Sequence, residues 1–88
     1  MRYFRTIATS AALAYMGKVE LQHQIRRLAS DASVVGGCLS VECPDGGFDL
    51  IEPETVQLFS DYVEAHDLDG TRVQIPYTMI AGVTVDLP

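Results

Sequence analysis

Apolar side chains recur along the chain with two periods, and these periods predict its elements. Residues 3–8 are predicted to form a short strand, with Tyr3, Arg5 and Ile7 facing one way and Phe4, Thr6 and Ala8 the other. Thr9 or Ser10 can then cap a helix, because their hydroxyls accept hydrogen bonds from its first amides. The helix is expected to end at Gly36-Gly37, and one face carries apolar residues at helical spacings, namely Leu21, Ile25, Leu28, Ala29 and Ala32.

The segment between Ala11 and Val19 fits two structures. Its alanines favour a continuous helix. Apolar residues of the segment also recur every second position, so a strand from Leu13 to Leu21, paired with Tyr3–Ala8 as a hairpin, is the alternative. The sequence leaves both interpretations open.

A hairpin is predicted in the middle of the chain. Cys38 to Cys43 alternates as a strand, and Phe48 to Ile51 returns as its partner. The residues between them, Pro44-Asp45-Gly46-Gly47, are typical of a turn, because proline fixes φ and glycine adopts positive φ without strain.

A second helix is predicted to begin at Glu52-Pro53-Glu54. Proline is tolerated in the first turn of a helix, and carboxylates suit its positive end. The expected apolar face consists of Val56, Phe59, Tyr62 and Val63. The opposite face, expected to point into solvent, consists of Glu54, Gln57, Asp61 and Glu64.

Two strands are expected after this helix. Residues 67–70 (Asp-Leu-Asp-Gly) form a turn, and strands follow over Arg72–Ile75 and Ile80–Leu87. Pro76 has no amide proton to donate, which indicates an edge strand or a bend. The expected fold is a single α+β domain over residues 1–88, a small antiparallel sheet of four to five strands with two helices packed on one face. Its predicted core comprises Ile25, Leu28, Val41, Phe59, Val63, Ile75 and Ile80.

Composition limits the classes of protein that this chain can belong to. Its 88 residues are 48% hydrophobic and 20% charged, which excludes a disordered chain and indicates one small core. No apolar run approaches the roughly 18 residues that cross a membrane. We therefore expect a small globular protein with no membrane partner.

The net charge of -6 is unevenly distributed along the chain. Residues 1–27 carry five cations and one carboxylate, whereas residues 28–71 carry ten carboxylates and no lysine or arginine. Such an acidic segment repels phosphate, so direct binding of nucleic acid is not expected. It would attract a basic protein surface. The alternative is that these carboxylates only keep the protein in solution.

Neither a catalytic group nor a metal site emerges from the sequence. Cys38 and Cys43 do not have zinc-finger spacing, and an odd offset places them on opposite faces of a strand, so we expect buried structural thiols. The turn at residues 67–70 lacks the oxygen ligands of a calcium loop. Ser60, Asp61 and Glu64 do not converge with His66 on a helix. We therefore expect no enzyme, no metal and no cofactor.

The first residues weakly imitate a secretion signal. Arg2 and Arg5 precede an apolar run, but Thr6, Thr9 and Ser10 interrupt that run. We therefore expect a cytoplasmic protein in a reducing compartment.

The opening of the chain, Met-Arg-Tyr-Phe-Arg-Thr-Ile-Ala-Thr followed by residues 13–16 (Leu-Ala-Tyr-Met), resembles the N-terminus of small phage anti-CRISPR proteins that block type I-F surveillance complexes. The resemblance covers about the first fifth of the chain and does not continue after Gly17. It implies a stand-alone, non-enzymatic inhibitor that occludes a basic nucleic-acid channel in a host cell. Exposed aromatic and charged residues act in that family, and Tyr15 is the counterpart here.

Charge layout and resemblance together predict a phage-encoded inhibitor that binds a basic surface of a host protein or nucleoprotein complex. The alternative is a structural or adaptor domain, either monomeric or homodimeric, whose acidic surface only keeps it in solution. The predicted partner-binding residues are Glu54, Asp61, Glu64, Asp67, Asp69 and Tyr15.

Overall fold

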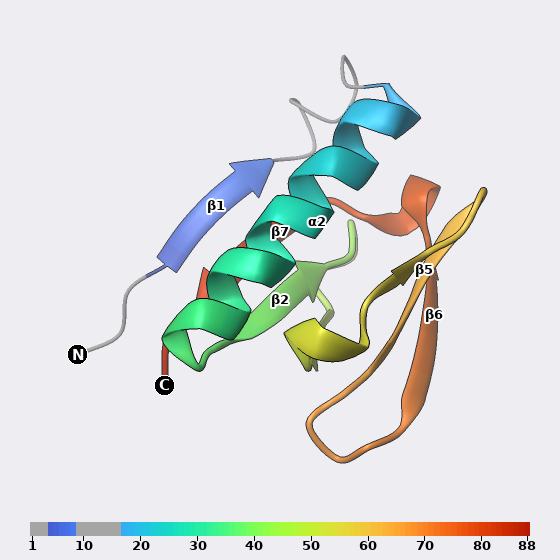
Figure 1. Ribbon diagram of the computed structural model, residues 1–88. Coiled ribbons are helices and arrows are strands. Elements are labelled where there is room, and N and C mark those ends of the chain that lie inside the picture. The colour runs from blue at the N-terminus through green and yellow to red at the C-terminus, as the bar shows by residue number, and fades with distance from the viewer. Residues whose placement is uncertain (1–3, 9–16) are drawn as a thin grey trace.

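One long helix lies across a four-stranded antiparallel sheet, and a smaller three-stranded sheet shares the same core (Figure 1). The computed structural model describes residues 4–8 and 17–88. The arrangement is α+β, as predicted. The strand order is β1-β7-β2-β3 in the larger sheet, here sheet A, and β4-β5-β6 in the smaller, here sheet B.

The predicted first helix is present as α2, Lys18–Val35, but it begins after Gly17, which is extended. The prediction of one continuous helix capped at Thr9 or Ser10 is therefore wrong at this residue. The buried residues of α2 are the five predicted ones, which spacings of three and four place on one face. Gly36 ends the helix with φ 71°, a left-handed conformation that glycine adopts without strain. The amides of Gly36 and Gly37 then donate to the carbonyls of Ser33 and Ala32, so both of these carbonyls are satisfied.

The first strand forms as predicted, as β1 (Phe4–Ala8), but its partner is not the segment after it. It pairs with β7 (Gly82–Asp86), and Lys18–Leu21 already belongs to α2. The alternative hairpin with a strand over Leu13–Leu21 is therefore wrong for these residues. The rest of that segment, residues 11–16, lies outside the described residues.

The centre of sheet A comes from the predicted hairpin and the last strand. Strand β2 (Cys38–Glu42) pairs with β3 (Phe48–Ile51) on one side and with β7 on the other. The turn between β2 and β3 contains Gly46 at φ 92°, the conformation for which glycine was expected. Both cysteines, predicted to be buried, are only half-buried, because Cys38 begins β2 and Cys43 follows it.

The second helix is not formed, and this prediction was wrong. Its first residues make only a single 3-10 turn, η1 (Pro53–Thr55), and the rest become strands β4 (Gln57–Leu58) and β5 (Tyr62–His66). Hydrogen bonds to β5 replace the helical ones. The Glu52 amide donates to the His66 carbonyl at 2.8 Å, and the His66 amide donates to the Thr55 hydroxyl at 2.8 Å.

Sheet B consists of β4, β5 and β6 (Arg72–Pro76), which is followed by the 3-10 turn η2 (Tyr77–Met79). Val63 and Ala65 of β5 point into the core, while Tyr62, Glu64 and His66 alternate with them on the outer face. Pro76 ends the edge strand β6, as its missing amide proton indicated. Sheet B meets sheet A where Ile51 forms a bridge with Asp67.

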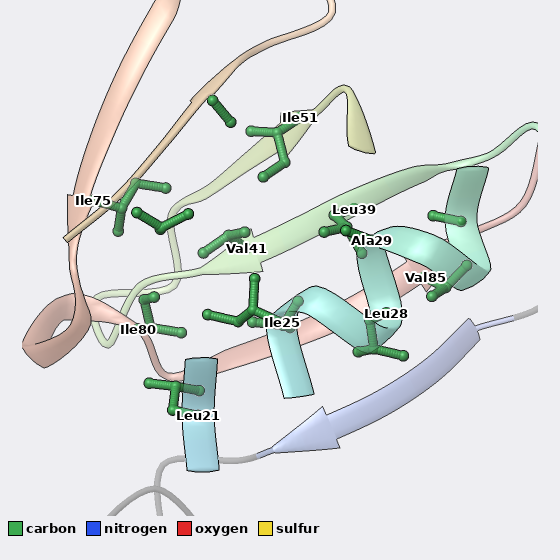
Figure 2. Packing of buried hydrophobic residues seen from close by; sticks show 14 of the residues in the cluster. Leu21, Ile25, Leu28, Ala29, Leu39, Val41, Ile51, Ile75, Ile80 and Val85 are labelled. Atoms are coloured by element: carbon green, nitrogen blue, oxygen red, sulfur yellow. The ribbon is translucent and has the colours of Figure 1, made fainter. Parts of the chain in front are cut away.

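The core lies between α2 and the two sheets. Figure 2 shows Ile25 of α2 close to Val41 of β2, and Leu28, Ile51 and Ile75 belong to the same cluster. Six of the seven predicted core residues are buried there. Phe59 is the exception: 40% of it is exposed, because it follows β4 in the turn before β5 and not on the inner face of a helix.

Candidate functional site

An aromatic pair, the exposed Phe59 and the half-buried Tyr62, flanks the turn between β4 and β5. Phe59 and Tyr62 flank the two-residue connection Ser60-Asp61, and the Phe59 amide donates to the Tyr62 carbonyl at 2.9 Å. The two rings stack with centroids 4.9 Å apart and planes inclined by 19°. Residues 59–62 are called the aromatic turn below. Large apolar groups exposed on a surface are typical of interaction sites, so this turn is the candidate site.

Tyr77 and Gln22 form hydrogen bonds that hold the backbone of the aromatic turn in place. Tyr77, which is 9% exposed, donates its hydroxyl to the Phe59 carbonyl at 2.7 Å and its amide to the Asp61 carbonyl at 3.2 Å. From α2, the Gln22 amide group donates to the same Phe59 carbonyl at 3.0 Å and to the Tyr77 hydroxyl at 3.2 Å. The backbone of the turn is thus hydrogen-bonded to both η2 and α2.

Two of the predicted partner-binding carboxylates, Asp61 and Glu64, lie in or beside this turn, but they differ in exposure and in hydrogen bonding. Asp61 is exposed in the turn itself. Glu64 lies on the outer face of β5 with its side chain 18% exposed, and it accepts a hydrogen bond from Gln74 at 2.8 Å. The Arg72 Nε atom lies 4.0 Å from the same Glu64 oxygen. Glu64 is therefore held within sheet B, whereas Asp61 projects from it.

The other predicted partner-binding residues are dispersed. Glu54 lies on η1 and accepts a hydrogen bond from Ser33 of α2 at 3.0 Å. Asp67 caps the β5–β6 turn by accepting from the Asp69 and Thr71 amides, and the Asp69 side chain is exposed. The expectation that Glu54, Asp61 and Glu64 share one helix face is wrong, because they lie on three different elements. Tyr15 lies outside the described residues.

Charges on the described surface are segregated. Helix α2 carries three exposed cations, Lys18, Arg26 and Arg27, together with Glu20 and Asp31, whereas the carboxylates of residues 42–69 lie on the strands and turns around the two sheets. Within the sheets, the described cations are Arg5 of β1 and Arg72 of β6. A basic partner would therefore be attracted to the sheet and turn surfaces rather than to the outer side of α2.

Side chains that could support catalysis are dispersed over the described residues. A groove of about 320 Å³ between α2 and the η1–β4 segment is lined by Arg26, Ser30, Ser33, Glu54 and apolar residues. Within residues 4–8 and 17–88, no cluster of three or more His, Cys, Asp or Glu side chains could hold a metal ion. Ser60 and Asp61 lie at one end of β5 and His66 at the other, so these groups do not meet.

No helix in the described part of the chain is both long enough and apolar enough to cross a membrane.

Removing the Tyr77 hydroxyl should loosen the aromatic turn without unfolding the protein. We expect Tyr77→Phe to cost about 1–2 kcal/mol of unfolding free energy, since the hydrogen bond to Phe59 and the one accepted from Gln22 are both lost while the ring stays in the core. Hydrogen exchange of the Phe59 amide should accelerate more than that of amides in β2. Equal acceleration throughout the chain would show that Tyr77 supports the whole fold and not this turn in particular.

The sequence named Asp61 and Glu64 of this site but assigned Phe59 and Tyr62 to the core. The signal that could have exposed them is alternation, since Leu58 and Val63 are inward on both sides of the turn and their neighbours are therefore outward. Comparisons of the chain with protein-family models, with curated proteins and with solved structures found no match.

Proposed function

We propose that this protein is a non-enzymatic inhibitor that binds a basic protein surface and covers it. The observation that carries the proposal is the segment of residues 28–71, which contains ten carboxylates and neither lysine nor arginine. A negative field of this kind raises the rate of encounter with a basic partner. Carboxylates also accept hydrogen bonds from lysine and arginine, as phosphates do.

The fold distributes this charge around the two sheets. Exposed carboxylates lie on the β2–β3 turn, on η1, on the aromatic turn and on the β5–β6 turn; they include Asp45, Glu54, Asp61 and Asp69. A partner approaching sheet B would therefore meet carboxylates at both ends of β5. This supports a broad electrostatic footprint in place of the single helix face that the sequence predicted.

The aromatic turn gives the proposed interface an apolar centre. Phe59 is 40% exposed, and Met79 of the neighbouring η2 turn is 47% exposed. Interfaces commonly combine aromatic and methionine side chains at their centre with a polar rim, and a few such residues carry most of the binding energy. Sheet B offers this combination around Asp61.

The resemblance of residues 1–16 extends the proposal to a class of target. It points to phage inhibitors of type I CRISPR complexes, in which a basic channel holds nucleic acid in the cytoplasm of the host. An acidic protein suits such a channel, because it can occupy lysine and arginine sites that phosphates would otherwise fill. Direct binding of nucleic acid by this protein is not part of the proposal, since its own carboxylates would repel phosphate.

Competition with nucleic acid provides the test. The immobilised protein is incubated with lysate of a bacterium that carries a type I CRISPR system, and bound material is eluted with increasing salt. We expect a basic nucleic-acid-binding protein that elutes as salt screens the carboxylates, and that a single-stranded oligonucleotide displaces.

Two results would contradict the proposal. If the captured protein resists both salt and oligonucleotide, the acidic segment is not its contact. If ultracentrifugation instead shows a stable homodimer and nothing is captured, the acidic surface serves only for solvation. A charge-reversed protein, Glu42→Lys with Asp69→Lys, serves as the control and should capture less, since both positions are exposed.

A further inference from the structure

We propose that the basic partner inserts an arginine side chain at the aromatic turn, where its guanidinium stacks on the Phe59–Tyr62 pair and bonds to Asp61. This inference rests on the proposed function, because it names the chemistry of the group that the acidic surface attracts. It concerns one position of the interface, whereas the function proposed above concerns the surface as a whole.

The aromatic pair has the geometry of a preformed platform for a cation. The rings already stack on each other, and the Phe59 side of the pair lies at the β4 edge of sheet B. The π face of an aromatic ring attracts a cation, and arginine, being planar, can lie flat on it. Three hydrogen bonds from Gln22 and Tyr77 end on the Phe59 and Asp61 carbonyls, so little backbone freedom of the turn should be lost on binding.

The surrounding charges complement a guanidinium. Asp61 is exposed between the two aromatic residues in sequence, and no ion pair involving it occurs among the described residues. One strand further on, Arg72 already extends its guanidinium to within 4.0 Å of Glu64 on the same outer face. The outer face of sheet B thus accommodates one arginine from this chain, and the aromatic turn offers an equivalent acidic position that no described cation fills.

Arginine is favoured over lysine by the shape of the site. Lysine carries a compact, strongly hydrated charge, which gains less from stacking than a planar and weakly hydrated guanidinium does. The fork of guanidinium donors can also bond to both oxygens of a carboxylate such as that of Asp61. A surface that acted through net charge alone would bind both cations equally.

Two peptides of equal charge test the inference. The ¹⁵N-labelled protein is titrated with acetylated, amidated hexa-arginine and separately with hexa-lysine, at low and at moderate salt. We expect hexa-arginine to bind about two- to fivefold more tightly than hexa-lysine. Its largest amide shifts should fall on residues 59–62 and on the Gln22 side chain.

Two variants isolate the contribution of the ring. Phe59→Leu keeps an apolar side chain but removes the π face, so it should abolish the preference for arginine while leaving hexa-lysine binding unchanged. Val34→Ala, which truncates a side chain of α2 that is 83% exposed, should leave both affinities unchanged. Thermal melting confirms that both variants are folded.

The outcomes separate the two proposals. Equal binding of both peptides, or shifts centred away from residues 59–62, would overturn the arginine site while leaving the acidic surface as a binding surface. If neither peptide binds, the arginine site is likewise wrong, and the capture experiment still decides the proposed function. If capture fails but hexa-arginine binds at the turn with the stated preference, the site stands and its target is not the proposed class.

Discussion

Truncating Leu28 to alanine is expected to lower the free energy of unfolding by about 2–5 kcal/mol. Leu28 is fully buried on α2, in the cluster that joins the helix to both sheets. The loss combines the apolar contacts of the removed atoms with the cavity that they leave. Because a domain of this size has a total stability of about 5–15 kcal/mol, denaturation by urea should show a clear shift of the midpoint.

Phe59→Ala is the matched control, and it also distinguishes the two structures considered for residues 52–66. A helix would bury Phe59, and truncation would then cost about as much as at Leu28. In the turn the residue is 40% exposed, so the loss should stay below the roughly 3–5 kcal/mol of a fully buried phenylalanine. It includes about 0.5–1.5 kcal/mol for the stack with Tyr62. A Phe59→Ala variant as unstable as Leu28→Ala would contradict the strand assignment.

The first helix and the β2–β3 hairpin could be predicted because their signals are local. The apolar positions from Leu21 to Ala32 share one helical face, and Gly36 supplies the left-handed residue that ends it. The turn after β2 contains Gly46 where positive φ is required. In both places the residues that determine the backbone conformation are close together in the sequence, so the prediction does not depend on contacts between distant segments.

The segment after Pro53 could not be predicted in the same way, because its apolar residues fit both periods. Val56, Phe59 and Val63 are spaced as on a helix, but Val56 and Leu58 also alternate before the turn, as Val63 and Ala65 do after it. The decisive interactions are distant: β5 pairs with β6, placing Val63 beside Ile75. β-branched and aromatic residues suit such pairing, but the partner strand is not visible from the segment itself.

The candidate site shows the same division. Asp61 is exposed as expected, since both the helix and the turn place it outside the core. The helical period places Phe59 in the core. When the segment forms strands instead, inward and outward positions change, and Phe59 is exposed. Glu64 kept its outward position but gained Gln74 and Arg72 as neighbours, which only the pairing of β5 with β6 brings close.

Because Glu64 has these neighbours, Asp61 is a better position than Glu64 for a charge reversal that tests the interface. Reversing Glu64 would bring a lysine next to Arg72 and remove the acceptor of the Gln74 bond, so lost binding could reflect a damaged sheet. Asp61→Lys avoids this, because the side chain is exposed and only the Asp61 backbone is used, as the acceptor for the Tyr77 amide. Exposed substitutions usually change stability by less than about 0.5 kcal/mol.

Asp69→Lys is the matched control, since it changes the net charge equally at an exposed position on the other turn of β5. We expect Asp61→Lys to weaken binding of hexa-arginine, and of the captured basic protein, by about tenfold or more, because a direct attraction becomes a like-charge contact. Asp69→Lys should weaken binding less, and mainly at low salt, because it changes only the field around the contact. Titration calorimetry of both variants at two salt concentrations measures this difference. Equal losses in the two variants would show that the partner responds to net charge alone and that the aromatic turn is not the centre of the interface.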